Sequence, residues 1–485
     1  MPGQVSARMA NAPDLVRPWA EDFRAQLPES YRLKLFPRKQ WEFDYIAQSA
    51  RDCGLLTGDK NALGIAVGSE PLIFHFASHA QSVVATDLYS ADTAWQTART
   101  EDLQHILDAS PFPYPRDRVS MRNADMRSLP FPDEQFDFCW SCSSVEHVGN
   151  IAEAVGVYDE IARVLKPGGY AILTTEFCVS PAPYVLPGVV ALDPELFRCI
   201  VQGHPALELV GDVDFTFDPY QLGNAAEARR YLTGARPNQF LSSWQFHRGR
   251  MAQLCGMSTI APFGFVLRKR GREKADWRQL GLSEPLTALT ESLLALDGGR
   301  PGEAIDRLQP CLTALTPQFQ MIAWRYYLDA VLRSGAKPHA IAAAEDGYLA
   351  ALPDGDIQDA DCGQLLAYSL GEHGRHAEAA SVYRRMAGTP SVLADHAITL
   401  AIDYLKQAGK AGSAGEARDY LAGTVLDLIE HGVPWSGIMP HLRSTLAAAG
   451  QPFDPVIKLI NPARAALRRE TGNRIGGGPA AIEEA

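Results

Sequence analysis

The sequence has no uninterrupted run of about 18 apolar residues, the length that a membrane-spanning helix needs. It has only eight cysteines in 485 residues, too few for a disulfide framework and typical of a reducing compartment. The N-terminal stretch carries charges at Arg8, Asp14, Arg17 and Glu21 in place of the apolar core of a secretory signal. These absences predict a cytoplasmic protein without a membrane span.

Basic charge is also scarce, because the net charge is −12. An acidic protein repels phosphate backbones unless a local basic patch overrides the total. The basic clusters are weak; the run from Arg268 to Arg272, for example, follows a predicted strand and is typical of a solvated domain edge. We therefore expect no nucleic-acid partner.

Three regions differ in pattern, which is expected for a chain too long for one core. Residues 1–60 are predicted to form a helical segment that packs on the next domain, residues 61–270. In that domain β-rich runs alternate with helical stretches, as in a parallel sheet with helices on both faces. These predicted strands are Leu63–Val67, Val83–Thr86, Val119–Met121, Phe136–Trp140 and Ala171–Thr175, with Pro262–Leu267 as the closing edge strand.

A glycine–alanine pair recurs in the region that follows, predicted as an all-α repeat domain over residues 280–465. Each glycine precedes an alanine by five residues, and the units are 36 to 39 residues apart, as in helical-hairpin repeats. The pairs are Gly299 and Ala304, Gly335 and Ala340, Gly374 and Ala379, and Gly412 and Ala417. The third unit is most similar to the tetratricopeptide (TPR) pattern, so we expect TPR-like repeats, followed by a flexible tail over residues 466–485.

A glycine-containing turn follows the first predicted strand of the sheet, in the segment from Ala62 to Glu70. Such a turn lets backbone N–H groups approach a ligand closely. Asp87 comes 19 residues after Gly68, at the end of the second strand, where a carboxylate can accept hydrogen bonds from both hydroxyls of a ribose. This pair alone also fits a dinucleotide-binding enzyme.

Further signals narrow the choice. Asp125 and Met126 follow the third strand, where a carboxylate and a backbone N–H can meet an adenine edge. A Glu146-His147-Val148 run follows the fourth strand, and Leu165 to Gly169 spell an LKPGG turn between a helix and the next strand. This order resembles the class I S-adenosylmethionine (SAM)-dependent methyltransferases of the ubiquinone-biosynthesis-like type, over roughly residues 60 to 180.

The resemblance implies an α/β, Rossmann-like fold with a mostly parallel, seven-stranded sheet, followed here by the helical repeats. It also implies SAM as cofactor. The family commonly has an acidic residue where Gly64 stands, and glycines where Ala66 and Glu70 stand. Glu70 is a possible replacement for the missing acidic group.

The same resemblance implies ten cofactor-binding residues. Around the methionine and ribose are Gly64, Ala66, Gly68 and Glu70; along the ribose and adenine are Asp87, Leu88, Asp125 and Met126; near the sulfonium are Ser141 and Ser143. For catalysis the candidates are His147, Glu146 and Glu176. We favour a structural role for Glu146, leave His147 open as a general base, and regard Glu176 as a base, an acceptor ligand or a loop residue.

Two other motifs have simpler explanations. Cys139 and Cys142 form a CxxC without the second pair that a zinc site needs, so we expect them to pack. Trp41 and Glu42 could form a lid over the cofactor, but Trp41 is more simply the residue that docks its helix onto the sheet.

The sequence thus predicts a methyltransferase (EC 2.1.1.-) that O-methylates a small molecule or glycan, with a possible protein partner on the helical repeats. Polar and aromatic residues between 179 and 250 suit a polyol acceptor: Asp212, Asp214, Asp218, Asn238, Trp244 and His247. One alternative is a TPR-like scaffold with a vestigial cofactor fold. Another is a nicotinamide-dependent oxidoreductase.

Overall fold

The structure, a computed structural model, describes most of the chain in two compact units. Among the described residues, the first unit extends to Ala344 and the second begins at Glu345. None of the helices of this described part is long and apolar enough to cross a membrane. The described residues are 5–11, 14, 21–32, 37–93, 96–179, 184–186, 188–216, 253–255, 258–313, 317–352, 360–387, 394–430 and 435–474.

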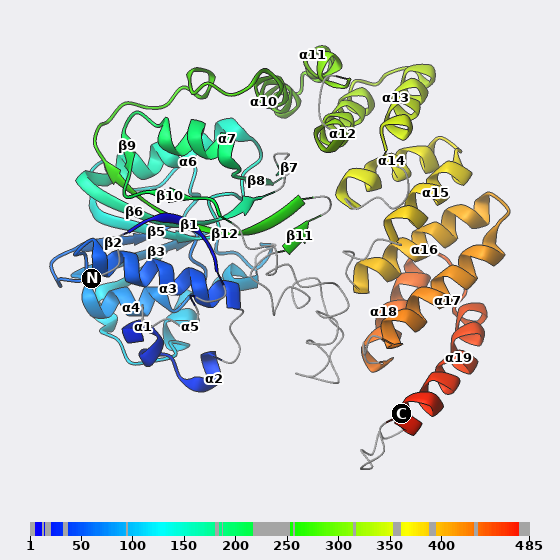
Figure 1. Cartoon of the computed structure of the whole chain (residues 1–485), viewed down its shortest axis with the longest axis horizontal. Helices are drawn as coiled ribbons and strands as arrows, with labels where there is room; N and C mark the ends of the chain where they lie inside the picture. The colour runs from blue at the N-terminus through cyan, green and yellow to red at the C-terminus, as the bar shows by residue number, and fades with distance from the viewer. Residues whose placement is uncertain are drawn as a thin grey trace. The chain divides into compact units, whose positions relative to one another are not determined.

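Five parallel strands form one half of the sheet in the first unit, in the order β4-β3-β2-β5-β6. These strands are β2 (Asn61–Gly64), β3 (Ser82–Asp87), β4 (Val119–Asn123), β5 (Phe136–Cys142) and β6 (Leu165–Cys178). Each overlaps a predicted strand, but β2 ends at Gly64, so the rest of the predicted strand Leu63–Val67 belongs to the turn. Helix α6 (Ile151–Val164) covers one face, and α4 (Leu72–His79) and α5 (Leu103–Asp108) the other (Figure 1). The strand order reverses at β2, and ligands of open α/β sheets bind outside the carboxyl ends of the strands at such a point.

The other half of the sheet is organised around β12 (Ser258–Lys269), which runs antiparallel to β6. Beyond it lie β1 (Ala7–Met9), β9 (Leu207–Leu209), β10 (Val213–Asp214) and β11 (Gln253–Cys255). The described residues therefore contribute ten strands to this sheet, and the prediction of seven is wrong. The prediction that Pro262–Leu267 closes the edge is also wrong, because β1 and β9 pair with β12 on the side away from β6.

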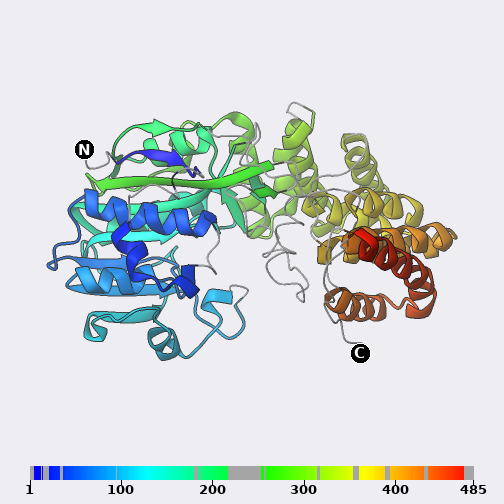
Figure 2. The same ribbon diagram turned by 60° about the horizontal axis from the view of Figure 1, so that its bottom comes forward.

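The N-terminal region is helical apart from β1, with α1 (Glu21–Gln26), α2 (Glu29–Arg32) and α3 (Pro37–Asp52). Helix α3 lies on the sheet (Figure 2). Trp41 is fully buried there, which confirms that it docks the helix. Tyr45 lies so close to β12 that a Cβ atom on Gly264 would come within 2.5 Å of its ring. A glycine at 264 is therefore what lets α3 approach the strand.

Helical hairpins follow the sheet, as the repeat pattern predicts. Each of the four predicted turn glycines has a positive φ, from +65° to +84°, which a glycine adopts at no steric cost. Gly450 (φ +66°) makes a fifth turn that the pattern missed, because Pro455 stands where the other units have alanine. The TPR assignment itself stays a prediction.

The hairpin helices are listed here by unit. In the first unit are α10 (Glu284–Asp297), α11 (Pro301–Leu308) and α12 (Pro317–Arg333), while α13 (Pro338–Ala351) spans the unit boundary. In the second are α14 (Ala360–Glu372), α15 (His376–Ala387), α16 (Ala394–Lys410), α17 (Ala414–Glu430), α18 (Trp435–Ala448) and α19 (Phe453–Arg474). The tail predicted from residue 466 is helical as far as Arg474 and otherwise lies outside the described residues.

Candidate functional site

The turn after β2 has no room for a side chain at its first position. A Cβ atom on Gly64 would lie 2.7 Å from the indole ring of Trp140 on β5. The same Cβ atom would lie 2.9 Å from the Val67 side chain, so Trp140 and Val67 together exclude the acidic residue that the resemblance places here. The turn continues through Ala66 and Gly68, both with positive φ (+53° and +51°), so its backbone has the strained conformation in which the family commonly uses glycine.

The same tryptophan holds the nearest carboxyl group of the turn. The indole N–H of Trp140 donates to Oε1 of Glu70 at 2.5 Å. Burial raises the pKa of Glu70 to about 8, although the Trp140 hydrogen bond opposes the shift. Glu70 therefore lies at the turn, as predicted for a replacement acid, and is mostly protonated at pH 7.

Asp87 links the end of β3 to the turn. Its Oδ2 accepts the N–H of Gly68 at 2.7 Å and its Oδ1 accepts the N–H of Leu88 at 2.7 Å. Burial raises the pKa of Asp87, and the two N–H groups oppose this shift. Each oxygen has a second lone pair for another donor. Leu88 beside it is 46% exposed, so an apolar surface adjoins the carboxylate.

Asp125 and Met126 follow β4 at the same edge. The N–H of Ala124 donates to the backbone oxygen of Asp87 at 2.9 Å, which keeps this segment beside β3. The Asp125 carboxylate pairs with Arg127, at 2.8 Å from its Nη2, and this hydrogen bonding lowers the pKa of Asp125. The carboxylate is therefore ionised, but its oxygens already accept hydrogen bonds from Arg127.

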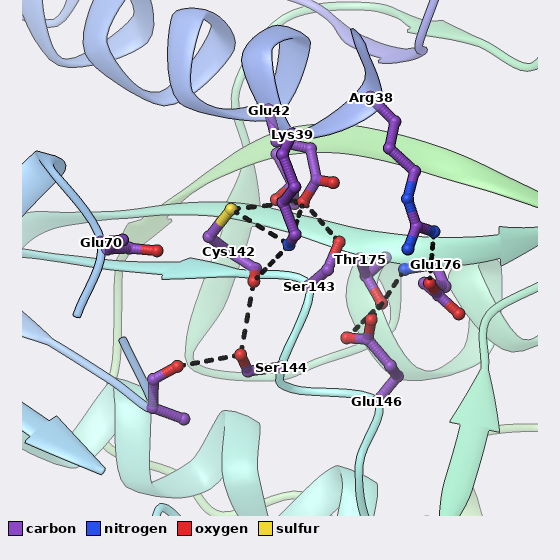
Figure 3. Close-up of polar contacts among 12 residues, drawn as sticks. Arg38, Lys39, Glu42, Glu70, Cys142, Ser143, Ser144, Glu146, Thr175 and Glu176 are labelled. Carbon is purple, nitrogen blue, oxygen red and sulfur yellow. Dashed lines mark hydrogen bonds and ion pairs between the residues drawn. The ribbon is translucent and has the colours of Figure 1, made fainter. Parts of the chain in front are cut away.

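The two predicted serines are Ser141, within β5, and Ser143, which follows it. Ser141 is fully buried in the strand, and its Oγ has no hydrogen-bond partner among the described residues. Ser143 has a positive φ (+48°) and donates to Oε2 of Glu42 at 2.5 Å. Ser144, which the sequence did not single out, donates to the backbone oxygen of Ala66 at 2.9 Å (Figure 3). The hydroxyls of this loop thus organise the turn and α3.

A buried ionic cluster joins α3 to the ends of β5 and β6, and sequence reasoning missed it. The Oε2 atom of Glu42 accepts from Lys39, Ser143, Cys142 and Thr174 at 2.5–3.2 Å (Figure 3). Burial alone would raise the pKa of Glu42, but Lys39 and Arg38 hold it below its ordinary value. The Lys39–Glu42 spacing on a helix was the available signal, but an i,i+3 pair is normally a surface feature.

Cys139 and Cys142 do not converge on one point. They are three residues apart on β5, so their side chains lie on opposite faces of the strand, and both are buried. The expectation that Cys139 packs is confirmed by its full burial. Cys142 packs too, but it also donates to Glu42.

The three catalytic candidates lie beside the loop after β5 and the end of β6 (Figure 3 shows Glu146 and Glu176). Glu146 is buried, and it accepts from the Thr175 hydroxyl and the Glu176 N–H, both at 3.0 Å. Burial and the neighbouring Glu176 charge raise the pKa of Glu146 to about 8. Both of its oxygens thus accept hydrogen bonds from β6, which is consistent with the structural role that we favoured.

Glu176 and His147 differ from Glu146 in their chemistry. Glu176 forms an ion pair with Arg38 at 3.0 Å, so its carboxylate already has a cationic partner. Burial lowers the pKa of His147, so the imidazole is neutral at pH 7 and able to take a proton. Of the other residues predicted to suit an acceptor, Asp218, Asn238, Trp244 and His247 lie outside the described residues.

Comparison with known proteins agrees with this geometry. Residues 63–173 match the family model described as a methyltransferase domain. Demethylmenaquinone methyltransferase of Clavibacter sepedonicus is 34% identical over 100 residues, 20% of this chain and 39% of that protein. 27-O-demethylrifamycin SV methyltransferase of Amycolatopsis mediterranei is 34% identical over 88 residues, 18% of this chain and 29% of that protein.

The chain therefore spans about two fifths or less of the length of these curated relatives. Among solved structures, the N-methyltransferase NodS of Bradyrhizobium japonicum is similar over 53% of this chain and 100% of that chain, with 12% identity and a TM-score of 0.30. The family match begins within β2 and ends within β6, so it spans most of the parallel half of the sheet.

Proposed function

We propose that the protein is a SAM-dependent methyltransferase whose cofactor binds at the carboxyl ends of β2, β3 and β4. The observation that carries this proposal is the Asp87 carboxylate, held at 2.7 Å from the Gly68 N–H. It places a carboxylate against a backbone turn at the point where the strand order reverses. The matched methyltransferase domain includes both residues.

The chemistry of the residues fits a nucleoside. The free lone pairs of Asp87 would accept the ribose hydroxyls, and the exposed Leu88 would contact the adenine face. The segment of Asp125 and Met126 would meet the adenine edge. Glu70 would face the α-ammonium group of the methionine end, where the positive charge would favour its ionised form.

When bound, SAM supplies an electrophilic methyl group, and the protein mainly orients the acceptor and excludes water. The neutral imidazole of His147 would take the proton of an acceptor hydroxyl. This supports O-methylation of a small molecule or glycan. The Amycolatopsis relative is named for an O-demethylated substrate, which supports the same class.

Calorimetry with the full-length protein and SAM tests this proposal. We expect binding in the wild type and a loss of roughly 1.5–3 kcal/mol of binding free energy in Asp87→Ala, because hydrogen bonds to a charged acceptor disappear. Asp92→Ala, which removes an exposed carboxylate nearby, is the control and should bind normally. Folded wild-type protein without any heat of binding would favour the scaffold alternative, and unchanged affinity in Asp87→Ala would contradict the assignment of Asp87.

A further inference from the structure

The first helices of the helical region pack on segments that form the candidate site, all within the first unit. The N–H of Ser283, at the start of α10, donates to Oε1 of Glu195 at 2.9 Å. At the other end of α10, Oδ2 of Asp297 accepts from the buried Asn150, which caps α6 after the loop of Glu146 and His147, at 3.3 Å. Helix α10 is thus tied to the loop that follows β5.

Helix α12 contacts a second such segment, the hairpin of β7 (Tyr184–Leu186) and β8 (Val189–Ala191). Tyr326 of α12 is 3% exposed, and its hydroxyl donates to the backbone oxygen of Val185 at 3.4 Å. Val185 and Val190 are buried as well. The hairpin is therefore packed beneath α12.

The same hairpin supports the candidate base. The N–H of Val190 donates to the backbone oxygen of Glu146 at 2.7 Å. At the hairpin turn, the backbone of Gly188 lies close enough to His147 to raise the pKa of the imidazole. One hairpin thus contacts Tyr326 on one side and the Glu146–His147 loop on the other.

We propose that Tyr326 is a positioning residue of the methyltransferase site, which holds the β7–β8 hairpin against His147 and so keeps the imidazole sheltered from water. The naming of His147 as the base rests on the proposed function, but the contacts do not. On this proposal the first helices after the sheet are part of the site, and are not only a surface for partners.

Several groups act on His147. Burial lowers its pKa, the Glu176 carboxylate on β6 and the Gly188 backbone raise it, and Lys39 on α3 lowers it. Glu146, the preceding residue, is itself mostly protonated at pH 7. Burial is the largest of these effects, so a looser hairpin that admits water should move the pKa of His147 up toward its ordinary value.

The test is an NMR titration of full-length protein labelled with [13C]histidine, in which the His147 signal is assigned by its loss in His147→Asn. We expect Tyr326→Phe to raise the His147 titration midpoint by about half a pH unit, the shift that loss of one weak hydrogen bond can produce. Tyr326→Leu should raise it further. Tyr327→Phe removes a hydroxyl from the next residue of α12 and should leave the midpoint unchanged.

Circular dichroism of each variant shows whether it is folded, and SAM calorimetry separates this proposal from the previous one. We expect Tyr326→Phe to bind SAM as the wild type does. A His147 midpoint that is the same in Tyr326→Phe and wild type would overturn the positioning role, as would an equal shift in Tyr327→Phe. If the wild type binds no SAM while the midpoint still moves, the proposed function fails and the contact between helix, hairpin and histidine stands.

Discussion

Trp140 limits which side chains fit in the glycine turn after β2. Its ring occupies the space that a side chain at position 64 would need, and its N–H holds Glu70 in the same region. The difference between this turn and the one that methyltransferases commonly have therefore involves three residues together. The small residue, the large ring and the displaced carboxyl group depend on one another.

A double-mutant cycle tests this dependence. Gly64→Ala should lower the free energy of unfolding by about 1–3 kcal/mol, the usual cost of overpacking a filled core. In a Trp140→Phe background, which removes the two ring atoms nearest to the new Cβ atom, the cost of Gly64→Ala should be clearly smaller. Urea unfolding of the four proteins measures the coupling, and additive costs would show that the ring is not what excludes a side chain at position 64.

At the scale of elements, the loop after β5 is fastened to β6 by Glu146. This carboxyl group accepts from Thr175 and from the Glu176 N–H, and its pKa in the folded protein is about 8. The pKa of a glutamate in the unfolded chain is about 4.3. Between these values the folded protein keeps a proton that the unfolded chain releases, so the stability from this group is complete at low pH and is lost as the pH rises toward 8.

Glu146→Gln should therefore make the loss of stability between pH 5 and pH 8 less steep. One such group contributes at most about 1.4 kcal/mol per pH unit to that slope. Urea unfolding at pH 5, 6.5 and 8 measures it. Glu160→Gln is the control, because the pKa of Glu160 is shifted in the opposite direction: hydrogen bonds and charge from Arg163 outweigh burial and lower it. Glu160 is therefore ionised in both the folded and the unfolded chain between pH 5 and pH 8, and its replacement should leave the slope unchanged. An unaltered slope in Glu146→Gln would mean that Glu146 is ionised in the folded protein.

For the whole molecule, the division into units does not follow the change from sheet to helices. Helix α10 belongs to the first unit with the sheet, and Leu289 in it is fully buried. Leu421 of α17 is equally buried in the second unit. These two leucines give a matched pair of cavity variants.

We expect Leu289→Ala to cost about 2–5 kcal/mol and to lower the calorimetric transition that Gly64→Ala also lowers, because α10 unfolds together with the sheet. Leu421→Ala should cost a similar amount and lower a different transition. The opposite result would be that Leu289→Ala and Leu421→Ala lower the same transition, and that Gly64→Ala lowers another. It would show that α10 unfolds with the other repeats. Differential scanning calorimetry distinguishes these outcomes.

The sequence by itself determined the parallel strands, the glycine turn with Asp87 and the turn glycines of the hairpins. Each depends on residues near one another in the chain, whose periodicity and spacing reflect local backbone geometry. Tertiary structure alone decided the rest: β1 beside β12, Glu42 as the acceptor from Cys142, Ser143 and Thr174, Trp140 against Gly64, and Tyr326 against the β7–β8 hairpin. These contacts join residues that lie tens to hundreds of positions apart, and packing sets them without leaving a repeat or a motif in the sequence.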